Sequence, residues 1–173
     1  MKFTIKIVNM VLTIKTDKTI DELCQYILGN QCNSIDFDKI DQIEYKSSFG
    51  TMTLFKTGKI LVRGVKNLTN FIDSLKYCFG DSFFEIYRSL RFNNIVLYVS
   101  FDKIIDLVKF YQKVIESKIP CLYEPSYIAF NVYCYLDGIT AIIGKNYMIL
   151  TGNVSIPDYI NVLNVLSDLI EKI

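Results

Sequence analysis

Few residues of this chain could carry catalytic or metal chemistry. The sequence contains no histidine, which removes the commonest general base and the usual zinc-ligand spacings. It also lacks a Gly-rich phosphate loop and a serine nucleophile elbow. Five cysteines form an odd set without a CxxC pair, and we expect them to be reduced and partly buried: Cys24, Cys32, Cys78, Cys121 and Cys134. The sequence therefore disfavours an enzyme and indicates no metal and no cofactor, although carboxylate or lysine chemistry remains open.

The charged side chains could instead bind a polyanion, but the sequence is not strongly basic. Lys and Arg number 19 against 18 Asp and Glu, which gives a net charge of +1. Residues 1–88 carry 12 basic and 10 acidic side chains, whereas residues 89–173 carry 7 and 8. Because neutralised phosphates supply most non-specific affinity for nucleic acid, binding would require basic residues gathered on one face.

The chain is long and apolar enough to fold by itself. Of its 173 residues, 51% are hydrophobic and 14% aromatic, which suffices for one domain or two small fused ones. No apolar run approaches the roughly 18 residues of a membrane-spanning helix, and the first residues lack the pattern of a signal peptide. We therefore expect an intracellular protein that contacts no membrane.

Two short stretches occur twice at the same spacing. KILVRG at residues 59–64 is matched by YMILTG at 147–152, so Gly152 follows Gly64 by 152 − 64 = 88 positions. IVNMV at 7–11 is matched by IVLYV at 95–99, again 95 − 7 = 88 positions later. Two matches with one offset predict a tandem duplication. We therefore expect two repeats, residues 1–88 and residues 89–173.

Each repeat has the same predicted order of elements. A strand at 3–14 or 92–100 precedes an amphipathic helix, whose apolar stripe is Ile20, Leu23 and Ile27 or Ile104, Val108, Tyr111 and Ile115. Short strands joined by turns follow: DQIEY, TMTLF and KILVRG, and then NVYCYL, ITAII and YMILTG. A closing helix has one apolar face, formed by Leu68, Phe71, Ile72, Leu75 and Phe79 or by Ile160, Leu163, Leu166 and Ile170. Ser155 and Pro157 are typical of the start of the last helix.

This order predicts an α+β fold in which four helices cover one face of a continuous antiparallel sheet. The other face would stay open. Alternation along the strands places Leu61 and Arg63 on one face of KILVRG, and Ile149 and Thr151 on one face of YMILTG. A broad open sheet face is unusual in a monomer and typically marks a binding surface.

The duplicated pattern resembles the core of the TATA-binding protein family over almost the whole chain. The motifs that carry the resemblance are IVNMV and NNIVLYV, TLFKTGKILVRG and AIIGKNYMILTG, and YEP at 123–125. The resemblance implies a saddle of two pseudo-symmetric repeats, with one curved antiparallel sheet and four helices on its convex face. It also implies that the concave face binds the minor groove of A·T-rich promoter DNA and bends it with apolar wedges, for which this family is itself the known example.

The family's wedge positions fall on Phe37 and Phe55 in the first repeat. In the second repeat they fall on Ile128 and Ile143, where the family has phenylalanine. Phe130 could replace Ile128 if the alignment shifts by two residues, since the chain is two residues shorter than the family pattern between YEP and AIIG. Isoleucine has no aromatic face, so the resemblance implies a shallower second kink. All four wedge residues could instead be core residues.

Other family positions imply contacts with base edges. Asn94 matches an asparagine that bonds minor-groove acceptors, whereas Lys6 stands at the corresponding first-repeat position. The apolar partners of these two positions are Val8 and Val96. Lys6 could also be an ordinary solvated strand residue.

The ends of KILVRG and YMILTG complete the implied DNA surface. Thr151 matches the family's threonine before the strand-end glycine, and Arg63 replaces it in the first repeat. Lys59 matches a phosphate-contacting lysine, while Asp36 lies where the family usually has arginine. Arg63, like Lys6, could simply be solvated.

The resemblance also implies protein partners. Tyr123, Glu124 and Pro125 match the loop by which the family engages transcription factor IIB, although they could form an unremarkable turn. A divergent general transcription initiation factor would bind a factor-IIB-like protein and the RNA polymerase machinery as well as promoter DNA. The open sheet could also pair two copies of the free protein.

Two other functions remain open on the sequence alone. The same fold could serve as an interaction module with weak or no DNA binding of its own, as its acid-rich first loop and missing wedge phenylalanines suggest. A small-molecule carrier or enzyme domain that uses the open sheet is a third class, which no convergent polar cluster supports and the absence of histidine disfavours. An Ile-, Lys-, Asn- and Tyr-rich composition is typical of an A·T-biased genome, such as that of a large DNA virus or a protist. A nuclear location, or a cytoplasmic viral replication site, would suit the transcription factor.

Overall fold

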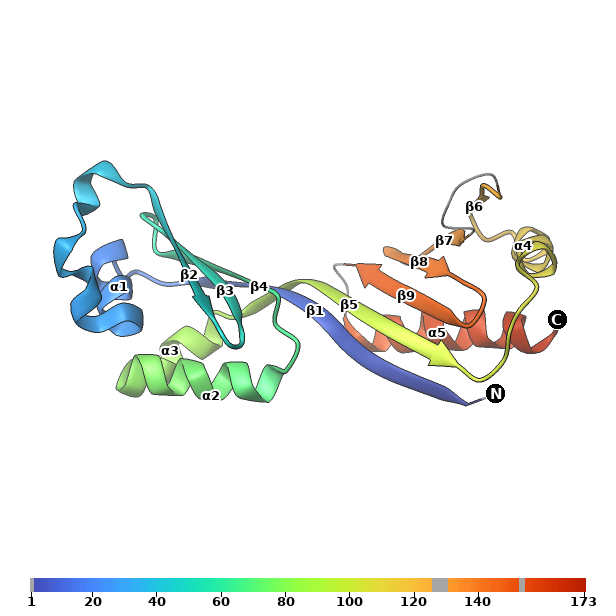
Figure 1. The fold of residues 1–173 in the computed structure, drawn as a ribbon, viewed down its shortest axis with the longest axis horizontal. Coiled ribbons are helices and arrows are strands. Elements are labelled where there is room, and N and C mark those ends of the chain that lie inside the picture. The colour runs from blue at the N-terminus through green and yellow to red at the C-terminus, as the bar shows by residue number, and fades with distance from the viewer. Residues whose placement is uncertain (1, 126–130, 153–154) are drawn as a thin grey trace. The chain divides into compact units, whose positions relative to one another are not determined.

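A computed structural model describes residues 2–125, 131–152 and 155–173, without the side chains of residues 30, 33 and 34. Figure 1 shows the order of the elements along the chain. The first part comprises β1 (Phe3–Lys15), α1 (Ile20–Leu28), η1 (Gly29–Ser34), η2 (Phe37–Lys39), β2 (Gln42–Ser47), β3 (Gly50–Phe55), β4 (Lys59–Arg63), α2 (Leu68–Phe79), η3 (Gly80–Ser82) and α3 (Phe83–Arg88). The second comprises β5 (Arg91–Phe101), α4 (Leu107–Glu116), β6 (Cys121–Tyr123), β7 (Val132–Leu136), β8 (Ile139–Ile143), β9 (Tyr147–Gly152) and α5 (Ile156–Glu171).

The α+β fold and the single sheet agree with the sequence prediction. The strands of the described residues are ordered β2-β3-β4-β1-β5-β9-β8-β7-β6 in one sheet. The four predicted helices are α1, α2, α4 and α5, and the short α3 follows α2 through η3. Strand β6 is an element that the sequence patterns did not predict. Within the described residues, no helix is long and apolar enough to cross a membrane.

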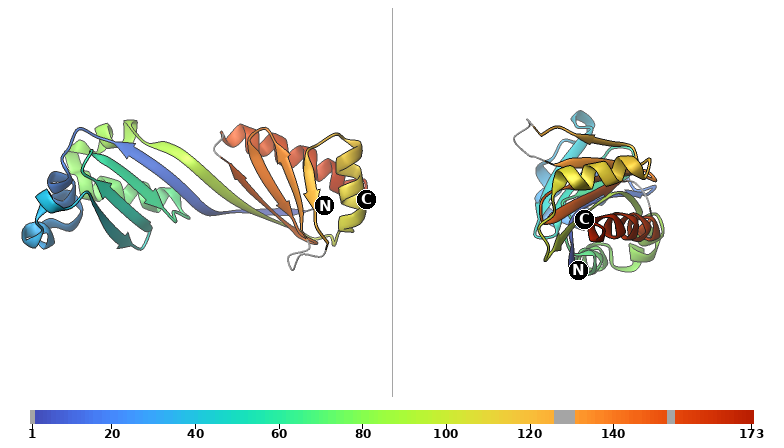
Figure 2. Two further views of the ribbon diagram at one scale, coloured as in Figure 1. Left: turned by 90° about the horizontal axis from the view of Figure 1, so that it is seen from above. Right: turned by 90° about the vertical axis from the view of Figure 1, so that its right-hand side faces the viewer.

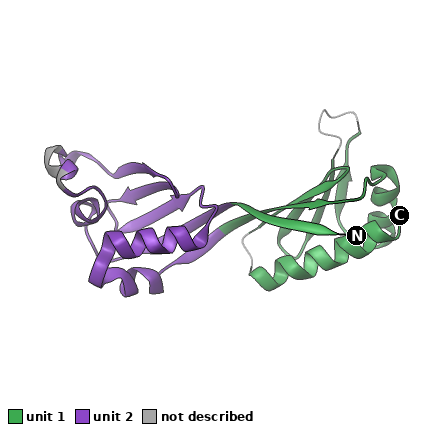
Figure 3. Cartoon of the chain, turned by 60° about the horizontal axis from the view of Figure 1, so that its bottom comes forward, with its two compact units in different colours: residues 1–8, 94–173 green, residues 9–93 purple. Residues whose placement is uncertain are grey.

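The chain divides into two compact units, and the boundaries between them fall within strands β1 and β5 (Figure 3). Unit 2 consists of residues 9–93, and unit 1 consists of residues 1–8 together with residues 94–173. Strand β1 therefore begins in unit 1 and ends in unit 2. The division into repeats at residues 1–88 and 89–173 remains a sequence prediction.

The core of unit 2 lies between its sheet and its helices. Figure 1 shows α2 and α3 on one side of strands β2 to β4. The side chains that face them alternate along the strands and are almost fully buried: Met10, Leu12, Ile14, Met52, Leu54, Ile60 and Val62. Helix α2 covers them with Phe71, Leu75 and Phe79, as its apolar periodicity predicted.

Unit 1 repeats this arrangement with α5. Figure 2 shows α5 lying along one face of the strands β7 to β9. The buried strand residues are Ile95, Val99, Val132, Cys134, Ile139, Ala141, Ile143, Met148 and Leu150. Helix α5 begins at the predicted cap, where the carboxylate of Asp158 accepts hydrogen bonds from Ser155 and Pro157 occupies the first turn. The Tyr159 hydroxyl lies within hydrogen-bond distance of the carbonyl oxygens of Ile95 and Gly152, which fixes α5 against β5 and β9.

The sequence prediction of which face α4 buries is wrong, because most residues of the predicted apolar stripe are exposed. Ile104 is 77% exposed, and Val108 and Ile115 are each 51% exposed. The helix instead buries Leu107, Phe110 and Val114. These residues are also spaced three and four apart, so the periodicity of this segment fits two faces and only packing distinguishes them.

Two of the five cysteines are bonded, which corrects the expectation that all are reduced. Cys24 on α1 and Cys32 in η1 form a disulfide, and both residues are fully or almost fully buried. The remaining thiols, Cys78, Cys121 and Cys134, are free. The separation of eight residues between Cys24 and Cys32 did not predict this disulfide, because the disulfide depends on how η1 folds back against α1.

Candidate nucleic-acid interface

The open face of unit 2 comprises the strand residues that alternate along each strand with the buried core residues. Thr13 on β1 pairs with Leu61 on β4, which in turn pairs with Thr53 on β3. Residues two positions away along each strand share this face. The open face of unit 2 therefore holds Asn9, Val11, Thr13, Lys15, Gln42, Glu44, Lys46, Thr51, Thr53, Phe55, Lys59, Leu61 and Arg63. It includes the predicted DNA-contact residues Phe55, Lys59, Leu61 and Arg63.

Two lysines on this face stand directly opposite each other. Lys15 and Lys59 are Cα partners across β1 and β4, and both are exposed. Like charges in this arrangement are destabilising unless an anion lies between or beside them. Lys59 Nζ also lies 5.6 Å from the centroid of the Phe55 ring, a cation–π contact. A cationic group and an aromatic ring thus lie together at the β3–β4 hairpin end.

Arg63 differs because its charge is already paired. Its guanidinium donates to the carboxylate of Glu44 at 2.7 Å and to the hydroxyl of Thr53 at 3.1 Å. Thr13, on the same face, has a buried hydroxyl without a hydrogen-bond partner among the described residues. A buried hydroxyl left unsatisfied is typical of a position that a ligand or water completes.

The open face of unit 1, over its described strand residues from Asn94 onward, is rich in tyrosine and carries no charged side chain. From Asn94 onward, the open-face strand residues are Asn94, Val96, Tyr98, Ser100, Leu122, Tyr133, Tyr135, Thr140, Ile142, Tyr147, Ile149 and Thr151. None of these described residues is Lys, Arg, Asp or Glu. Tyr98 and Tyr147 stack with their ring centroids 5.7 Å apart and their planes at 16°. The predicted contacts Asn94, Val96, Ile149 and Thr151 all lie on this face.

The pairing registers correct the sequence equivalence of the first strands. Leu12 pairs with Val62 and Leu97 with Leu150, and Val62 and Leu150 each lie two residues before the matched glycine. The first strands are therefore equivalent at an offset of 97 − 12 = 85 rather than 88. Asn94 corresponds to Asn9, not to Lys6, and Val96 corresponds to Val11, not to Val8.

The two equivalent asparagines use their side-chain oxygens in the same way. Asn9 Oδ1 accepts a hydrogen bond from the backbone N–H of Gly64 at 3.0 Å. Asn94 Oδ1 accepts one from the Thr151 hydroxyl at 3.1 Å. Because each oxygen is engaged at the strand end, the amide NH₂ is the group that can serve a ligand, and it can only donate. Sequence reasoning missed Asn9 because the first-strand match was three residues out of register.

A second register difference removes Ile143 from the predicted DNA surface. Leu54 pairs with Ile60, and Ile143 pairs with Met148, which is equivalent to Ile60 at the offset of 88. Ile143 thus corresponds to Leu54, and it is completely buried in the core. The position equivalent to Phe55 is Gly144. The β8–β9 turn shifts the register by one residue, and a shift of one residue reverses the face of every side chain.

Of the other predicted wedges, the described residue Phe37 lies in a 3-10 turn rather than on a strand of the open face. Phe37 begins η2 and is half-buried, next to an ion pair in which Lys39 Nζ lies 2.7 Å from the carboxylate of Asp36. Ile128 and its alternative Phe130 lie outside the described residues. Lys6 and Val8 are exposed residues of the first part of β1, in unit 1.

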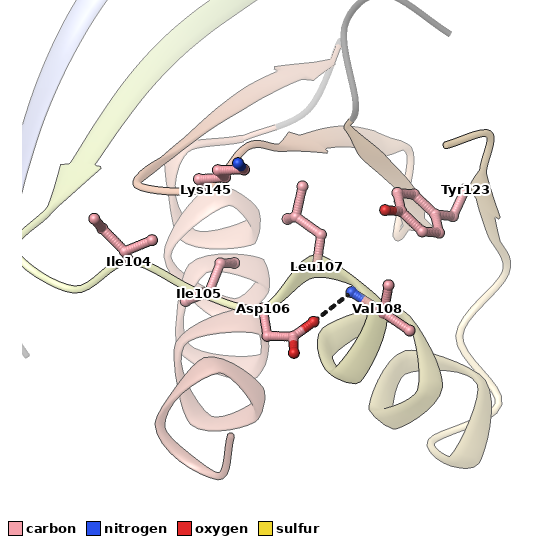
Figure 4. A pocket seen from close by; sticks show the side chains of 7 residues that line it. All are labelled: Ile104, Ile105, Asp106, Leu107, Val108, Tyr123 and Lys145. Carbon is pink, nitrogen blue, oxygen red and sulfur yellow. Dashed lines mark hydrogen bonds between the residues drawn. The ribbon is translucent and has the colours of Figure 1, made fainter. Parts of the chain in front are cut away.

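The predicted partner loop lies beside a pocket of about 610 Å³ in unit 1 (Figure 4). Tyr123 at the end of β6 lines one side, and Ile104 lies on the opposite side. The remaining lining comprises Ile105, Asp106, Leu107, Val108 and Lys145. Asp106 caps α4 by accepting from the N–H groups of Val108 and Lys109, so its carboxylate is occupied. Glu124 and Pro125 follow Tyr123 and are exposed.

Comparison with known proteins supports the fold. Neither a protein-family model nor a curated protein sequence matches the chain. Among solved structures, the chain is similar to heterotetrameric sarcosine oxidase from Corynebacterium sp. U-96 in complex with pyrrole 2-carboxylate. The identity is 12% over 98% of this chain and 84% of that one, and the TM-score of 0.32 is too low to carry an argument. It is also similar to Methanococcus jannaschii TBP, at 18% identity over 98% of this chain and 99% of that one, with a TM-score of 0.68. The chain therefore has the fold of a TATA-binding protein.

Proposed function

We propose that this protein is a transcription initiation factor that binds A·T-rich promoter DNA in the minor groove through its open sheet faces and bends the duplex. The observation that supports this most is the pair of equivalent asparagines, Asn9 and Asn94, one on each open face. In the minor groove, A·T pairs present only the acceptors A N3 and T O2. An amide NH₂ with its oxygen already engaged has the complementary chemistry.

The proposal is tested by duplex binding and bending together. Fluorescence anisotropy would compare an A·T-rich duplex with a G·C-rich control, while energy transfer between end labels reports bending. Asn9→Ala and Asn94→Ala should each weaken A·T-rich binding about tenfold, because each removes a base-edge contact. Asn164→Ala, on an exposed position of α5, is the matched control. Equal affinity for both duplexes without bending would refute minor-groove promoter recognition.

Under the same proposal, the loop at Tyr123, Glu124 and Pro125 recruits a factor-IIB-like protein, and through it the RNA polymerase machinery. The pocket beside Tyr123 supports a protein contact here, since its lining is mainly apolar and Ile104 and Val108 are exposed at its edge. The protein would act in the nucleus, or at a cytoplasmic replication site if a virus encodes it. Loss of a ternary complex on DNA in Tyr123→Ala, with unchanged duplex binding, would support this role.

A second candidate is an interaction module of the same fold that does not bind DNA alone. The Arg63–Glu44 ion pair favours the interaction module, because the Glu44 carboxylate neutralises the Arg63 cation and places an acidic group on the open face. The two candidates differ in one measurement. The interaction module would show no preference for the A·T-rich duplex at any salt concentration.

A further inference from the structure

Tyr147 occupies the space that a side chain at position 144 would fill. A Cβ atom built on Gly144 would lie 2.3 to 2.9 Å from three atoms of the Tyr147 ring. No Cβ atom could occupy that place unless the ring moved. Gly144 is the structural equivalent of Phe55, and Tyr147 is the equivalent of Lys59 at the offset of 147 − 59 = 88.

The two hairpins therefore place an aromatic ring at the same site from opposite strands. In unit 2, the ring belongs to Phe55 at the end of β3, and its neighbour on β4 is Lys59. In unit 1, the ring belongs to Tyr147 at the start of β9, and its neighbour is Gly144 after β8. Unit 1 has Gly144 where unit 2 has Phe55, and Tyr147 where unit 2 has Lys59. Each open face therefore keeps one aromatic ring at its hairpin end.

The Tyr147 ring is held in place by two further contacts. Tyr98 stacks on one of its faces at 5.7 Å, and the Tyr147 hydroxyl lies 3.2 Å from Asn131 Oδ1. Tyr98 belongs to the open face of unit 1, and the Tyr147 ring is only half-buried. A ring fixed in this way loses little freedom on binding and can stack on a flat apolar group.

We propose that Tyr147 is the residue of unit 1 that opens a base step of the bound duplex. Tyr98 supports its ring, and the absence of a side chain at Gly144 leaves room for the ring. The inference rests on the proposed function, and it replaces the sequence assignment of that role to Ile143. Aromatic and apolar side chains inserted from the minor groove unstack a base step and kink the duplex. Stacking on a base tolerates tyrosine as well as phenylalanine, because the contact is made through the face of the ring.

The primary test places 2-aminopurine at successive steps of the A·T-rich duplex, because its fluorescence rises where stacking is lost. The wild-type protein should open two separated steps. Tyr147→Ala should abolish one of the two signals and weaken binding about tenfold, whereas Phe55→Ala should abolish the other. Tyr147→Phe should retain both signals. Tyr77→Ala, which alters a 92% exposed ring on α2, is the control and should change neither signal nor affinity.

Gly144→Ala provides a test that leaves every aromatic residue in place. Its methyl group must displace the Tyr147 ring, so the unit 1 signal should fall as in Tyr147→Ala while the thermal midpoint shows that the protein is folded. The chain contains no tryptophan, so Tyr147→Trp adds a single emission reporter that stacking on a base would quench.

The outcomes separate this inference from the proposed function. If the wild-type protein binds and bends the A·T-rich duplex but Tyr147→Ala and Gly144→Ala still open both steps, the role of Tyr147 is refuted and the function stands. If the wild-type protein neither prefers this duplex nor opens any step, both are refuted. Quenching of the Tyr147→Trp emission only by the A·T-rich duplex would support both.

Discussion

Arg63 cannot act as an independent cation while Glu44 is its partner. The two groups lie 2.7 Å apart on the open face of unit 2, with side chains 48% and 46% exposed. A pair this accessible contributes at most about 1 kcal/mol to stability, since water and salt screen it. In the proposed DNA complex, the Glu44 carboxylate would repel phosphates and occupy the Arg63 guanidinium at the same time.

Glu44→Gln should therefore strengthen duplex binding several-fold. The log–log slope of affinity against salt should become steeper by about 0.9, the value expected for one additional neutralised phosphate. Titration of the wild-type protein and the variant across a salt series measures both quantities. Glu116→Gln removes an equally close acid that pairs with Lys113 on α4, and it should leave both quantities unchanged. Unchanged affinity in Glu44→Gln would show that Arg63 does not face the DNA.

At the scale of elements, the periodic pattern predicted the helices and strands well but not their exact alignment between the repeats. The glycine-ended strands β4 and β9 match at the predicted offset of 88, whereas β1 and β5 match at 85. Alternation did not reveal this three-residue shift, because apolar residues lie on both faces of β1 and β5. The register is instead fixed by backbone pairing between segments far apart in sequence, and the positions of Asn9, Ile143 and Gly144 show the consequence.

The Cys24–Cys32 disulfide should stabilise the outer end of unit 2, where it joins α1 to η1. Closing a loop of eight residues restricts the unfolded chain and contributes about 2 kcal/mol in the chain-entropy model. The urea midpoint should therefore fall when a reductant is added to the wild-type protein. Cys24→Ala combined with Cys32→Ala should abolish this response, whereas Cys78→Ala should retain it. A midpoint insensitive to the reductant would mean that the bond does not stabilise the fold.

Tyr159 links α5 to both β5 and β9, and it should make the fold sensitive to alkali. Burial raises the pKa of its hydroxyl above the ordinary value of 10.0. Above about pH 10 the unfolded chain loses this proton while the folded protein retains it, so the stabilising contribution falls as pH rises. Tyr159→Phe should lose this component of the pH dependence. It should also cost about 1–3 kcal/mol at neutral pH, because the single O–H donor that lies between the carbonyl oxygens of Ile95 and Gly152 is lost. Urea unfolding at pH 7 and above pH 10 tests both expectations, and a variant as stable as the wild-type protein at pH 7 would contradict them.

At the scale of the whole molecule, the two open faces carry different side chains, and the proposed DNA binding would draw on both. The face of unit 2 carries the cations Lys15, Lys46 and Lys59, while the strand residues described for unit 1 from Asn94 onward offer tyrosines and amides. A net charge of +1 conceals this division, because acids elsewhere offset the lysines. The salt-dependent part of binding should therefore come from unit 2, and the salt-independent part from unit 1.

Replacing Lys15, Lys46 and Lys59 together by Gln should flatten the salt dependence of duplex binding. If each lysine neutralises one phosphate, the log–log slope should become shallower by about 2.7, at about 0.9 per contact. Gln at Lys109, Lys118 and Lys172, three exposed positions on α4 and near helix ends, removes the same charge and should leave the slope unchanged. Tyr147→Ala should lower affinity by a similar factor at every salt concentration. Equal flattening by both lysine sets would mean that net charge, rather than the open face of unit 2, attracts the DNA, and the proposed division between the faces would then be wrong.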